Sequence, residues 1–172
     1  EAWGFSLWAH NAGYGPTGRE AAASRALNAL RPSLTQVPPL RGGAFSRWFN
    51  ELTHAELQQV WSNPTLRATV EARLRAPGGM HEWLMVSRAP TFKQWGVTAE
   101  QIAAMRTPTS QVRFANPPGV HGGPGSTAAH NEILQIIDSS PNFATFRQRL
   151  QQWANNRLEG GANALPPGLR PD

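Results

Sequence analysis

Cysteine is absent from the 172 residues of this chain, and lysine is almost absent. Without cysteine there can be no disulfide, thiolate nucleophile or zinc-thiolate site, so histidine and the carboxylates are the strong metal ligands that remain. No apolar run approaches the roughly eighteen residues of a membrane span, and no charged-then-apolar leader is present, so we expect neither feature. The first residue, Glu1, is not methionine, and we expect an excised piece of a longer protein.

The chain carries an excess of positive charge, nearly all of it on arginine. Of its 16 basic residues Lys93 is the single lysine, which leaves fifteen arginines, and the formal net charge is +5 at pH 7. Arginine presents a planar fork of donors that matches phosphate oxygens, so nucleic acid is the first candidate partner. A GC-rich coding sequence would also enrich arginine together with Ala, Gly and Pro, and composition does not decide between these explanations.

Capping residues and hydrophobic periodicity predict a mainly helical fold. The chain is 40% hydrophobic and has seven tryptophans, enough for the core of one domain. Possible capping boxes and an Asn-Pro start predict helices over residues 17–30, 53–61, 63–76 and 98–106. Apolar spacing predicts two more, one around His130 and one that starts at Pro141 and ends at residues 160–161.

Two short apolar segments, residues 80–87 and 110–115, predict strands. The expected class is therefore mainly α with a small two-stranded β element, an α+β fold. Within this single domain we expect four regions: an N-terminal arm, a helical subregion, a catalytic region and an extended tail, at residues 1–16, 17–79, 80–163 and 164–172.

Residues 120–132 place two of the five histidines around a glycine-rich turn that opens a helix. At 100° per residue, His130 lies in line with Ile133 and Ile137, on the face expected to be buried. A buried histidine needs a partner. That partner is a backbone carbonyl or, because His121 is near in sequence, a metal ion.

Two known motifs are similar to this turn but are incomplete. The string His-Gly-Gly-Pro-Gly is similar to the oxyanion-hole loop of some α/β-hydrolases, but no G-x-S-x-G elbow follows it. A P-loop needs lysine after its last glycine, and Gly125 is followed by Ser126. The remaining interpretation is a helix N-terminus whose free amides could hold an anion.

The spacing of His81, His121 and His130 resembles that of the His-Me finger (HNH-type) nucleases, in which a β-hairpin and a helix hold one divalent metal ion. The resemblance covers about residues 80–137 and implies a ββα-metal core inserted among helices. It implies that His81 is the general base or first ligand and that His121 and His130 bind the metal. It also implies that Asn131 orients the reacting groups.

Glu82 departs from this pattern and leaves two alternatives open. Many family members carry a metal ligand immediately before the base, where this chain has Met80, whereas Glu82 follows His81. Either His81 is the base and Glu82 is structural, or His81 is a ligand and Glu82 acts near the metal. Side chains of neighbouring strand residues point to opposite faces, so we expect only one of the two in the site. The metal could be Mg, Mn, Zn or Ni.

Four arginines are candidates for holding nucleic-acid phosphates. Arg147 and Arg157 border the apolar stripe of the last expected helix, and Arg106 and Arg113 flank the second expected strand. Arginine stems also cover apolar surface, and a positive charge near a helix C-terminus is favourable, so these positions can equally be structural.

The chain as a whole resembles the C-terminal toxin domains of bacterial polymorphic toxins, including those of Rhs proteins. The segments that carry the resemblance are residues 79, 95–97, 130–132 and 165–169. The resemblance implies a secreted effector, monomeric when free, that cleaves DNA or RNA in the cytoplasm of a competitor cell and has a cognate immunity protein. The alternatives are a metal-free ribonuclease, an ADP-ribosyltransferase and a non-catalytic Arg-rich interaction domain.

Overall fold

The computed structural model describes residues 18–22 and 30–172 of the chain. They belong to two compact units, Glu1–Ser33 and Leu34–Asp172. In the first unit, residues 18–22 are helical, as expected. The expected arm lies outside the described residues, as do Thr17, the expected cap of the first helix, and residues 23–29 of that helix. The second unit contains both expected strands and the histidines of the expected site.

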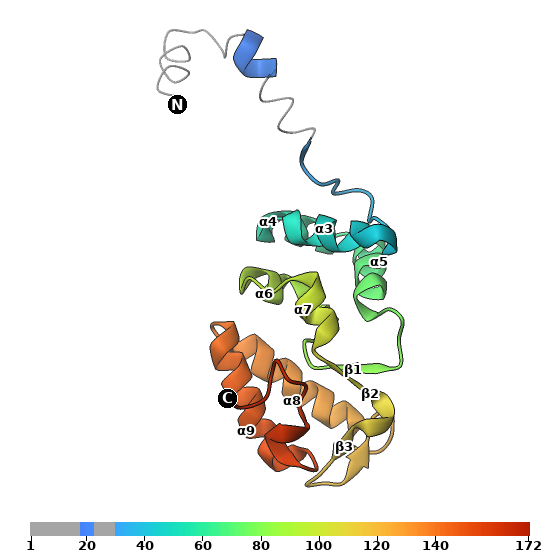
Figure 1. Cartoon of the computed structure of the whole chain (residues 1–172), viewed down its shortest axis with the longest axis vertical. Helices are drawn as coiled ribbons and strands as arrows, with labels where there is room; N and C mark the ends of the chain where they lie inside the picture. The colour runs from blue at the N-terminus through green and yellow to red at the C-terminus, as the bar shows by residue number, and fades with distance from the viewer. Residues whose placement is uncertain (1–17, 23–29) are drawn as a thin grey trace. The chain divides into compact units, whose positions relative to one another are not determined.

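The second unit is mainly α-helical with a small amount of β-structure, which confirms the expected α+β class (Figure 1). Its α-helices are α3 (Ala44–Glu51), α4 (His54–Trp61), α5 (Pro64–Arg75), α6 (Ala89–Gln94), α7 (Ala99–Ala104), α8 (Ser126–Ser139) and α9 (Phe143–Arg157). Short 3₁₀ helices lie at Arg41–Gly43, Val86–Arg88, Thr109–Gln111 and Gly161–Ala164. None of the described helices is long and apolar enough to cross a membrane.

The β-structure consists of two antiparallel pairs of strands. Strand β1 (Met80–Glu82) pairs with β2 (Arg106–Pro108), and β3 (Arg113–Phe114) pairs with β4 (Gly119–Val120). The two strands expected at residues 80–87 and 110–115 therefore do not pair with each other, and each is shorter than expected.

The first of these strands ends early because the apolar run belongs to the core rather than to a sheet. After Glu82 the chain turns into the 3₁₀ helix Val86–Arg88 and then into α6, while Trp83 and Leu84 are fully buried. A short apolar run does not distinguish a strand from a buried helical turn, which explains the wrong prediction.

Side-chain caps account for the helices that were predicted well. Capping boxes at Thr53 and Thr98 begin α4 and α7, and the Asn63 side chain accepts hydrogen bonds at the start of α5. Helix α9 begins two residues later than expected from Pro141, because Asn142 is its N-cap and accepts a hydrogen bond from the Thr145 amide.

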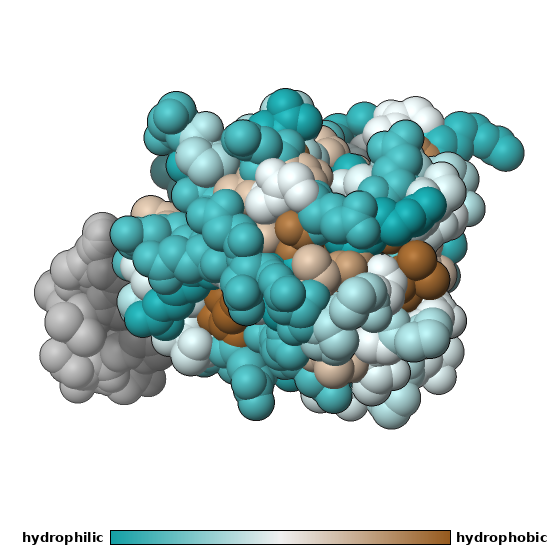
Figure 2. Space-filling view, turned by 90° about the horizontal axis from the view of Figure 1, so that it is seen from below, coloured by the Kyte–Doolittle hydropathy of each residue, from teal (hydrophilic) through white to brown (hydrophobic). Residues whose placement is uncertain are grey.

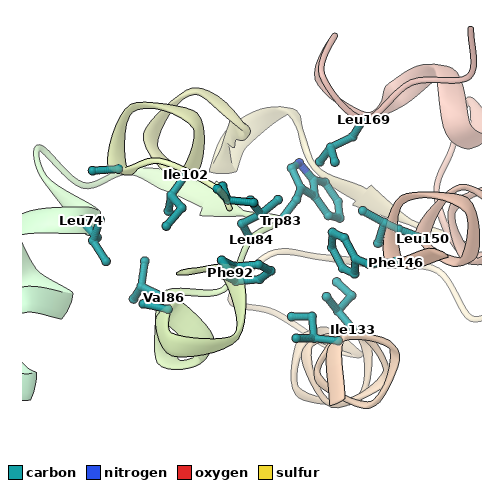
Figure 3. Packing of buried hydrophobic residues seen from close by; sticks show 14 of the residues in the cluster. Leu74, Trp83, Leu84, Val86, Phe92, Ile102, Ile133, Phe146, Leu150 and Leu169 are labelled. Carbon is teal, nitrogen blue, oxygen red and sulfur yellow. The ribbon is translucent and has the colours of Figure 1, made fainter. Parts of the chain in front are cut away.

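The core of the second unit joins the β1 segment to the helices on both sides of it. In Figure 3, Ile133 of α8 and Phe146 and Leu150 of α9 lie on one side of Trp83, and all four side chains are buried. The Trp83 ring also contacts His81, at 4.1 Å between ring centroids. Packing around Trp83 therefore positions the first histidine of the site.

The C-terminal tail is folded rather than extended, contrary to the prediction for residues 164–172. Leu165 and Leu169 are fully buried, and the amide of Leu169 donates to the carbonyl of Pro166 to form a turn. The Gln151 side chain of α9 donates to the carbonyl of Leu169 at 2.8 Å. Burial of two leucines stabilises the tail against α9, although its proline content suggested an extended chain.

Candidate metal centre

Three histidines from three separate elements meet at one point of the second unit. His81 lies in the middle of β1, His121 follows β4, and His130 lies in the second turn of α8. One ring nitrogen from each histidine can be chosen so that all three nitrogens lie within 4.8 Å of one another. The predicted convergence of the three histidines is thus confirmed.

The nitrogen separations suit a shared metal ion. His81 Nδ1 lies 3.0 Å from His121 Nδ1 and 3.3 Å from His130 Nε2. Two nitrogens that each bind one ion at about 2.1 Å, at angles between octahedral and tetrahedral, are about 3.0 to 3.4 Å apart. The His81–His121 and His81–His130 separations therefore match those of two ligands of one ion, and all three nitrogens lie within 4.8 Å of one another.

Hydrogen bonds among the three rings leave His81 incompletely satisfied. Its Nδ1 faces both other histidines, whereas its Nε2 is buried and has no hydrogen-bond partner among the described residues. A neutral imidazole has one N–H and one lone pair, so either tautomer leaves one buried group of His81 unpaired. Metal binding at Nδ1 would use the lone pair that points into the cluster.

Burial favours the uncharged forms of His81 and His130. Burial, together with smaller contributions from the neighbouring His130 and His121, lowers the pKa of His81 from 6.5 to about 3. Burial also lowers the pKa of His130, with a further contribution from His121, while Ser126 and Glu82 oppose the shift. Neutral imidazole is the form of histidine that binds metal ions.

A serine one helical turn earlier orients His130. Ser126 Oγ lies 3.4 Å from His130 Nδ1 and accepts a hydrogen bond of 3.0 Å from the Gly122 amide. If His130 Nδ1 carries the proton, it donates to Ser126, and the lone pair of Nε2 faces His81. A partner of this kind on the outer nitrogen is usual for histidine ligands of metals.

Two glycines shape the turn that brings His121 next to α8. Gly125, the residue before the helix, has a φ of 82°, which is unfavourable for a residue with a side chain. A Cβ at Gly119 would lie 2.1 Å from the carbonyl oxygen of Pro124, so the strand and the turn can approach only because no side chain is present.

Glu82 lies at the same pocket as the histidines, contrary to the expectation that only one residue of the His81-Glu82 pair would do so. The pocket has a volume of about 240 Å³ and is lined by Arg75, Met80, His81, Glu82, Met85, His121 and His130. Strand β1 ends at Glu82, so regular alternation of side chains does not continue beyond it. The Glu82 carboxylate accepts hydrogen bonds from Arg75 Nε at 3.1 Å and from the Val86 amide at 3.4 Å.

Asn131 is not brought into this pocket. Its side chain is exposed on α8, one position after His130, and it is absent from the residues that line the pocket. Successive helix residues point about 100° apart, so His130 and Asn131 cannot both face the cluster.

The ββα arrangement differs from the one that the resemblance implies. A hairpin followed by a helix is present as β3, β4 and α8, and it carries His121 and His130. His81 comes from β1, which belongs to the other sheet. The third nitrogen is therefore supplied from outside the hairpin-helix unit.

Arg157 holds this hairpin to the two helices rather than facing a groove. The residue is 5% exposed, and its Nε donates to Glu132 Oε1 at 2.9 Å. Its Nη1 donates to the carbonyls of Ala115 and Pro117, just after β3. With its guanidinium buried in this way, Arg157 is not available to a nucleic-acid phosphate, and we assign it to the structure.

The other three candidate arginines also use part of their guanidinium groups within the protein. Arg106 Nη1 donates to the carbonyls of Arg75 and Ala76, each at 3.1 Å. Arg113 is exposed and donates to the carbonyls of Ser110 and Val112 at 2.7 and 3.1 Å. Arg147 pairs with the exposed Asp172 at 2.9 Å. None of the three lines the histidine pocket.

Two residues at the site, Ser126 and Arg75, were not predicted from the sequence. Ser126 precedes His130 by four residues, a spacing that places both on one face of a helix and could have indicated their contact. Arg75 reaches the pocket because the C-terminal end of α5 packs beside β1 and β2. That contact depends on tertiary packing, and no local pattern in the sequence indicates it.

The chain matches no protein-family model, no curated protein sequence and no solved structure. The resemblances to His-Me finger nucleases and to polymorphic toxins therefore stay predictions.

Proposed function

We propose that this chain is a metal-dependent hydrolase that cleaves phosphodiester bonds of DNA or RNA. The observation that carries the proposal is the cluster of His81, His121 and His130, whose facing nitrogens are separated by 3.0 and 3.3 Å. The positive net charge of +5 supports an anionic polymer as substrate.

Of the two roles open to His81, the geometry favours that of a ligand. Its Nδ1 lies between the nitrogens of the other two histidines, and only 1% of the residue is exposed. A general base must reach a water molecule beside the substrate, which a buried ring cannot do. Glu82 is then the group that acts near the metal, because its carboxylate lines the same pocket.

Each residue has a defined part in this reaction. A bound divalent ion would supply a Lewis acid that activates water and stabilises charge on the phosphate oxygens. Three protein ligands leave coordination positions for water and substrate. Glu82 accepts the proton of the attacking water at a carboxylate oxygen, and Ser126 keeps the His130 ring in the orientation that faces the cluster.

The ligand type narrows the choice of metal. Three imidazole nitrogens suit Zn²⁺ or Ni²⁺, whereas Mn²⁺ and Mg²⁺ prefer oxygen ligands and Mg²⁺ also keeps most of its water. Of the four metals considered from the sequence, we therefore place Mg²⁺ last.

Cleavage assays test this proposal. Chelator-treated protein would be incubated with plasmid DNA and with a structured RNA, first in EDTA and then with Zn²⁺, Ni²⁺, Mn²⁺ or Mg²⁺. We expect hydrolysis only after metal is restored. The variant E82Q should bind metal normally but lose about 100-fold or more in kcat, since positioned acid-base groups contribute roughly that much.

Matched variants show whether the cluster is responsible. H130A should lose both metal binding and cleavage, whereas H54A should keep both, because His54 lies at the start of α4, outside the cluster. Equal cleavage in EDTA and in metal would contradict the proposal and favour a metal-free ribonuclease. Metal binding without cleavage of either polymer would leave a purely structural ion and contradict it as well.

We extend the proposal to a toxin domain that acts in the cytoplasm of a competitor cell. The supporting observation is the resemblance of the chain to the C-terminal domains of polymorphic toxins, which also implies an immunity protein. Induced expression in a bacterial host should stop growth for the wild type and permit it for H130A at equal protein level. Equal growth of the two strains would contradict a toxic nuclease.

A further inference from the structure

Arg75 is the cationic side chain at the rim of the histidine pocket. It is the last residue of α5, lines the pocket and has a side chain that is 49% exposed. Its Nε pairs with Glu82 Oε2 at 3.1 Å. The residue therefore touches both the pocket and the carboxylate next to His81.

The guanidinium of Arg75 keeps donors available on the side that faces solvent. Its Nε is used by Glu82, but its two Nη atoms have no hydrogen-bond partner within residues 18–22 and 30–172. Arg106 and Arg157 differ in this respect, because their Nη1 atoms donate to backbone carbonyls. An Arg fork with open donors is suited to two oxygens of a phosphate group.

Backbone contacts hold Arg75 at this position. Its carbonyl oxygen accepts hydrogen bonds from Arg106 Nη1 at 3.1 Å and from the Gly78 amide at 2.8 Å. Glu82 and Arg106 are directly opposite each other in the β1–β2 pair. One strand thus anchors the main chain of Arg75 and the other its side chain, so little conformational freedom remains to be lost on binding.

The charges of the pocket favour an anion once a divalent ion is present. The histidines are neutral when they bind metal, and the charges of Arg75 and Glu82 cancel, so a bound ion would leave the pocket with a charge of about +2. A phosphodiester carries one negative charge and has two free oxygens. The ion and the open Nη atoms of Arg75 can therefore engage the same phosphate.

From this geometry we infer that Arg75 is the residue that binds the substrate phosphate at the pocket, a role that rests on the proposed function. It selects a charged phosphodiester over a neutral ester or amide, because only the phosphate offers the fork two oxygens that share a negative charge. Arg75 is thereby distinguished from the arginines that hold the fold together.

Oligonucleotide binding in EDTA, where no hydrolysis occurs, tests the role of Arg75. The probe is a short fluorescein-labelled single strand, as DNA and as RNA, and its affinity is measured by anisotropy over a range of salt concentrations. We expect R75Q to bind about tenfold more weakly or worse. Its salt slope should also fall by roughly one, the amount expected for one lost phosphate contact.

Two further variants separate a phosphate contact from a general loss of charge. R149Q removes an exposed arginine of α9 that donates to the carbonyl of Ser139 and does not line the pocket, and it should bind like the wild type. R75K keeps the charge and should keep the slope, yet bind more weakly than the wild type because an ammonium lacks the fork. Far-UV circular dichroism would verify that all three variants are folded.

The inference is overturned if R75Q keeps wild-type affinity and slope, if R149Q weakens binding as much as R75Q, or if R75K loses the slope. These binding measurements use metal-free protein. If they contradict the role of Arg75 while metal-dependent cleavage is found, the inference is wrong and the proposed hydrolase still stands. Conversely, a wild type that binds no metal but shows the expected R75Q effect would contradict the proposed hydrolase and retain the anion-binding role of Arg75.

Discussion

The protonation of His81 depends on its burial and on the two neighbouring histidines. His81 is 1% exposed, and its environment strongly disfavours a positive charge. The buried, neutral His81 is costly to leave without a further partner, since one of its nitrogens is unpaired in either tautomer. An ion that binds all three facing nitrogens would satisfy the cluster, which is why we regard the histidines as ligands rather than as core residues.

The lowered pKa of His81 makes the metal-free protein less stable in acid. The unfolded chain binds a proton at His81 below pH 6.5, whereas the folded chain does so only near pH 3, so the free energy of unfolding falls as pH drops between these values. At pH 4.5 the loss from this one group is about 3 kcal/mol. Urea unfolding between pH 7 and 4.5 measures it.

The matched variant for this test is H81L, which cannot titrate at this position. Carboxylates whose pKa is lowered in the folded state, such as Asp138 beside Arg88, weaken both proteins in acid alike. The wild type should therefore show the steeper pH dependence. Parallel curves for the two proteins would disprove the pKa assigned to His81.

Ser126 offers a test of how the His130 ring is oriented. Replacement by alanine removes the oxygen that lies 3.4 Å from His130 Nδ1. We expect S126A to weaken metal binding by roughly tenfold to 100-fold, the usual effect of losing a partner behind a histidine ligand. Competition with a chromophoric chelator measures the affinity, and S139A, an exposed serine near the end of the same helix, is the control. Equal metal affinity of S126A and S139A would count against this orientation.

At the scale of secondary structure, Arg157 of α9 connects α8 to the β3–β4 hairpin, the two elements that carry His130 and His121. Its guanidinium joins Glu132 of α8 to the carbonyls of Ala115 and Pro117, which follow β3. The Arg157 carbonyl also accepts from the Ala115 amide at 2.9 Å. These bonds hold the segment after β3 against α8 and α9, the helices that lie next to the hairpin carrying His121.

Loss of Arg157 should therefore reduce stability. R157Q removes the ion pair of a buried arginine with the partly exposed Glu132, and the carbonyl contacts of the same guanidinium. We expect the free energy of unfolding to fall by about 2 kcal/mol or more. R149Q, at an exposed position of the same helix, should change it by less than about 0.5 kcal/mol. Guanidinium unfolding of both variants and the wild type measures the difference. A loss of less than about 0.5 kcal/mol in R157Q would show that the packing of the hairpin against α8 and α9 does not depend on Arg157.

Local signals in the sequence predicted some elements and missed others for physical reasons. Thr53, Asn63 and Thr98 are caps whose effect is local, and the helices that they begin were predicted well. Helix α3 follows Gly43, which makes no side-chain cap, and was missed. The partner of β1 is distant in sequence, whereas β3 pairs with the neighbouring two-residue strand β4, which was not predicted; the short strands were therefore assigned to the wrong pair. The folded tail depends in the same way on burial of its two leucines against α9.

In the candidate site, too, the sequence indicated the residues with a local signal and missed those that depend on tertiary contacts. Histidine spacing indicated His81, His121 and His130, since few residues can bind a metal in a chain without cysteine. Spacing could not show that Glu82 lines the pocket or that Asn131 lies outside it. Nor could it separate Arg75 from the fourteen other arginines, because burial and hydrogen bonding of a guanidinium depend on the folded chain.

For the molecule as a whole, the metal site should couple to folding. The three ligands come from β1, the turn after β4 and α8, so an ion binds the folded unit and not the unfolded chain. A metal at 100 times its Kd should stabilise the protein by about 2.7 kcal/mol and raise its Tm. Thermal unfolding with and without Zn²⁺ measures the shift, which H121A should lose and H54A should keep. Equal shifts in both variants would place the ion elsewhere.

The surface agrees with a protein that acts on a polar substrate. Figure 2 shows a face that is mostly hydrophilic, with hydrophobic residues in small, separate patches. Among the described residues, the large hydrophobic side chains that are exposed are Leu30, Leu40 and Val120. On the face shown, small patches of this kind favour recognition by charge and hydrogen bonds over a broad apolar contact.

An anomalous difference map from crystals soaked with Zn²⁺ would locate the ion itself. The three-histidine site predicts one strong peak about 2.0 to 2.1 Å from His81 Nδ1, His121 Nδ1 and His130 Nε2. The same crystals of H130A should lack that peak while any surface-bound zinc remains. A wild-type map with zinc only at other positions, and none between the three rings, would contradict the metal centre and the hydrolase proposed from it.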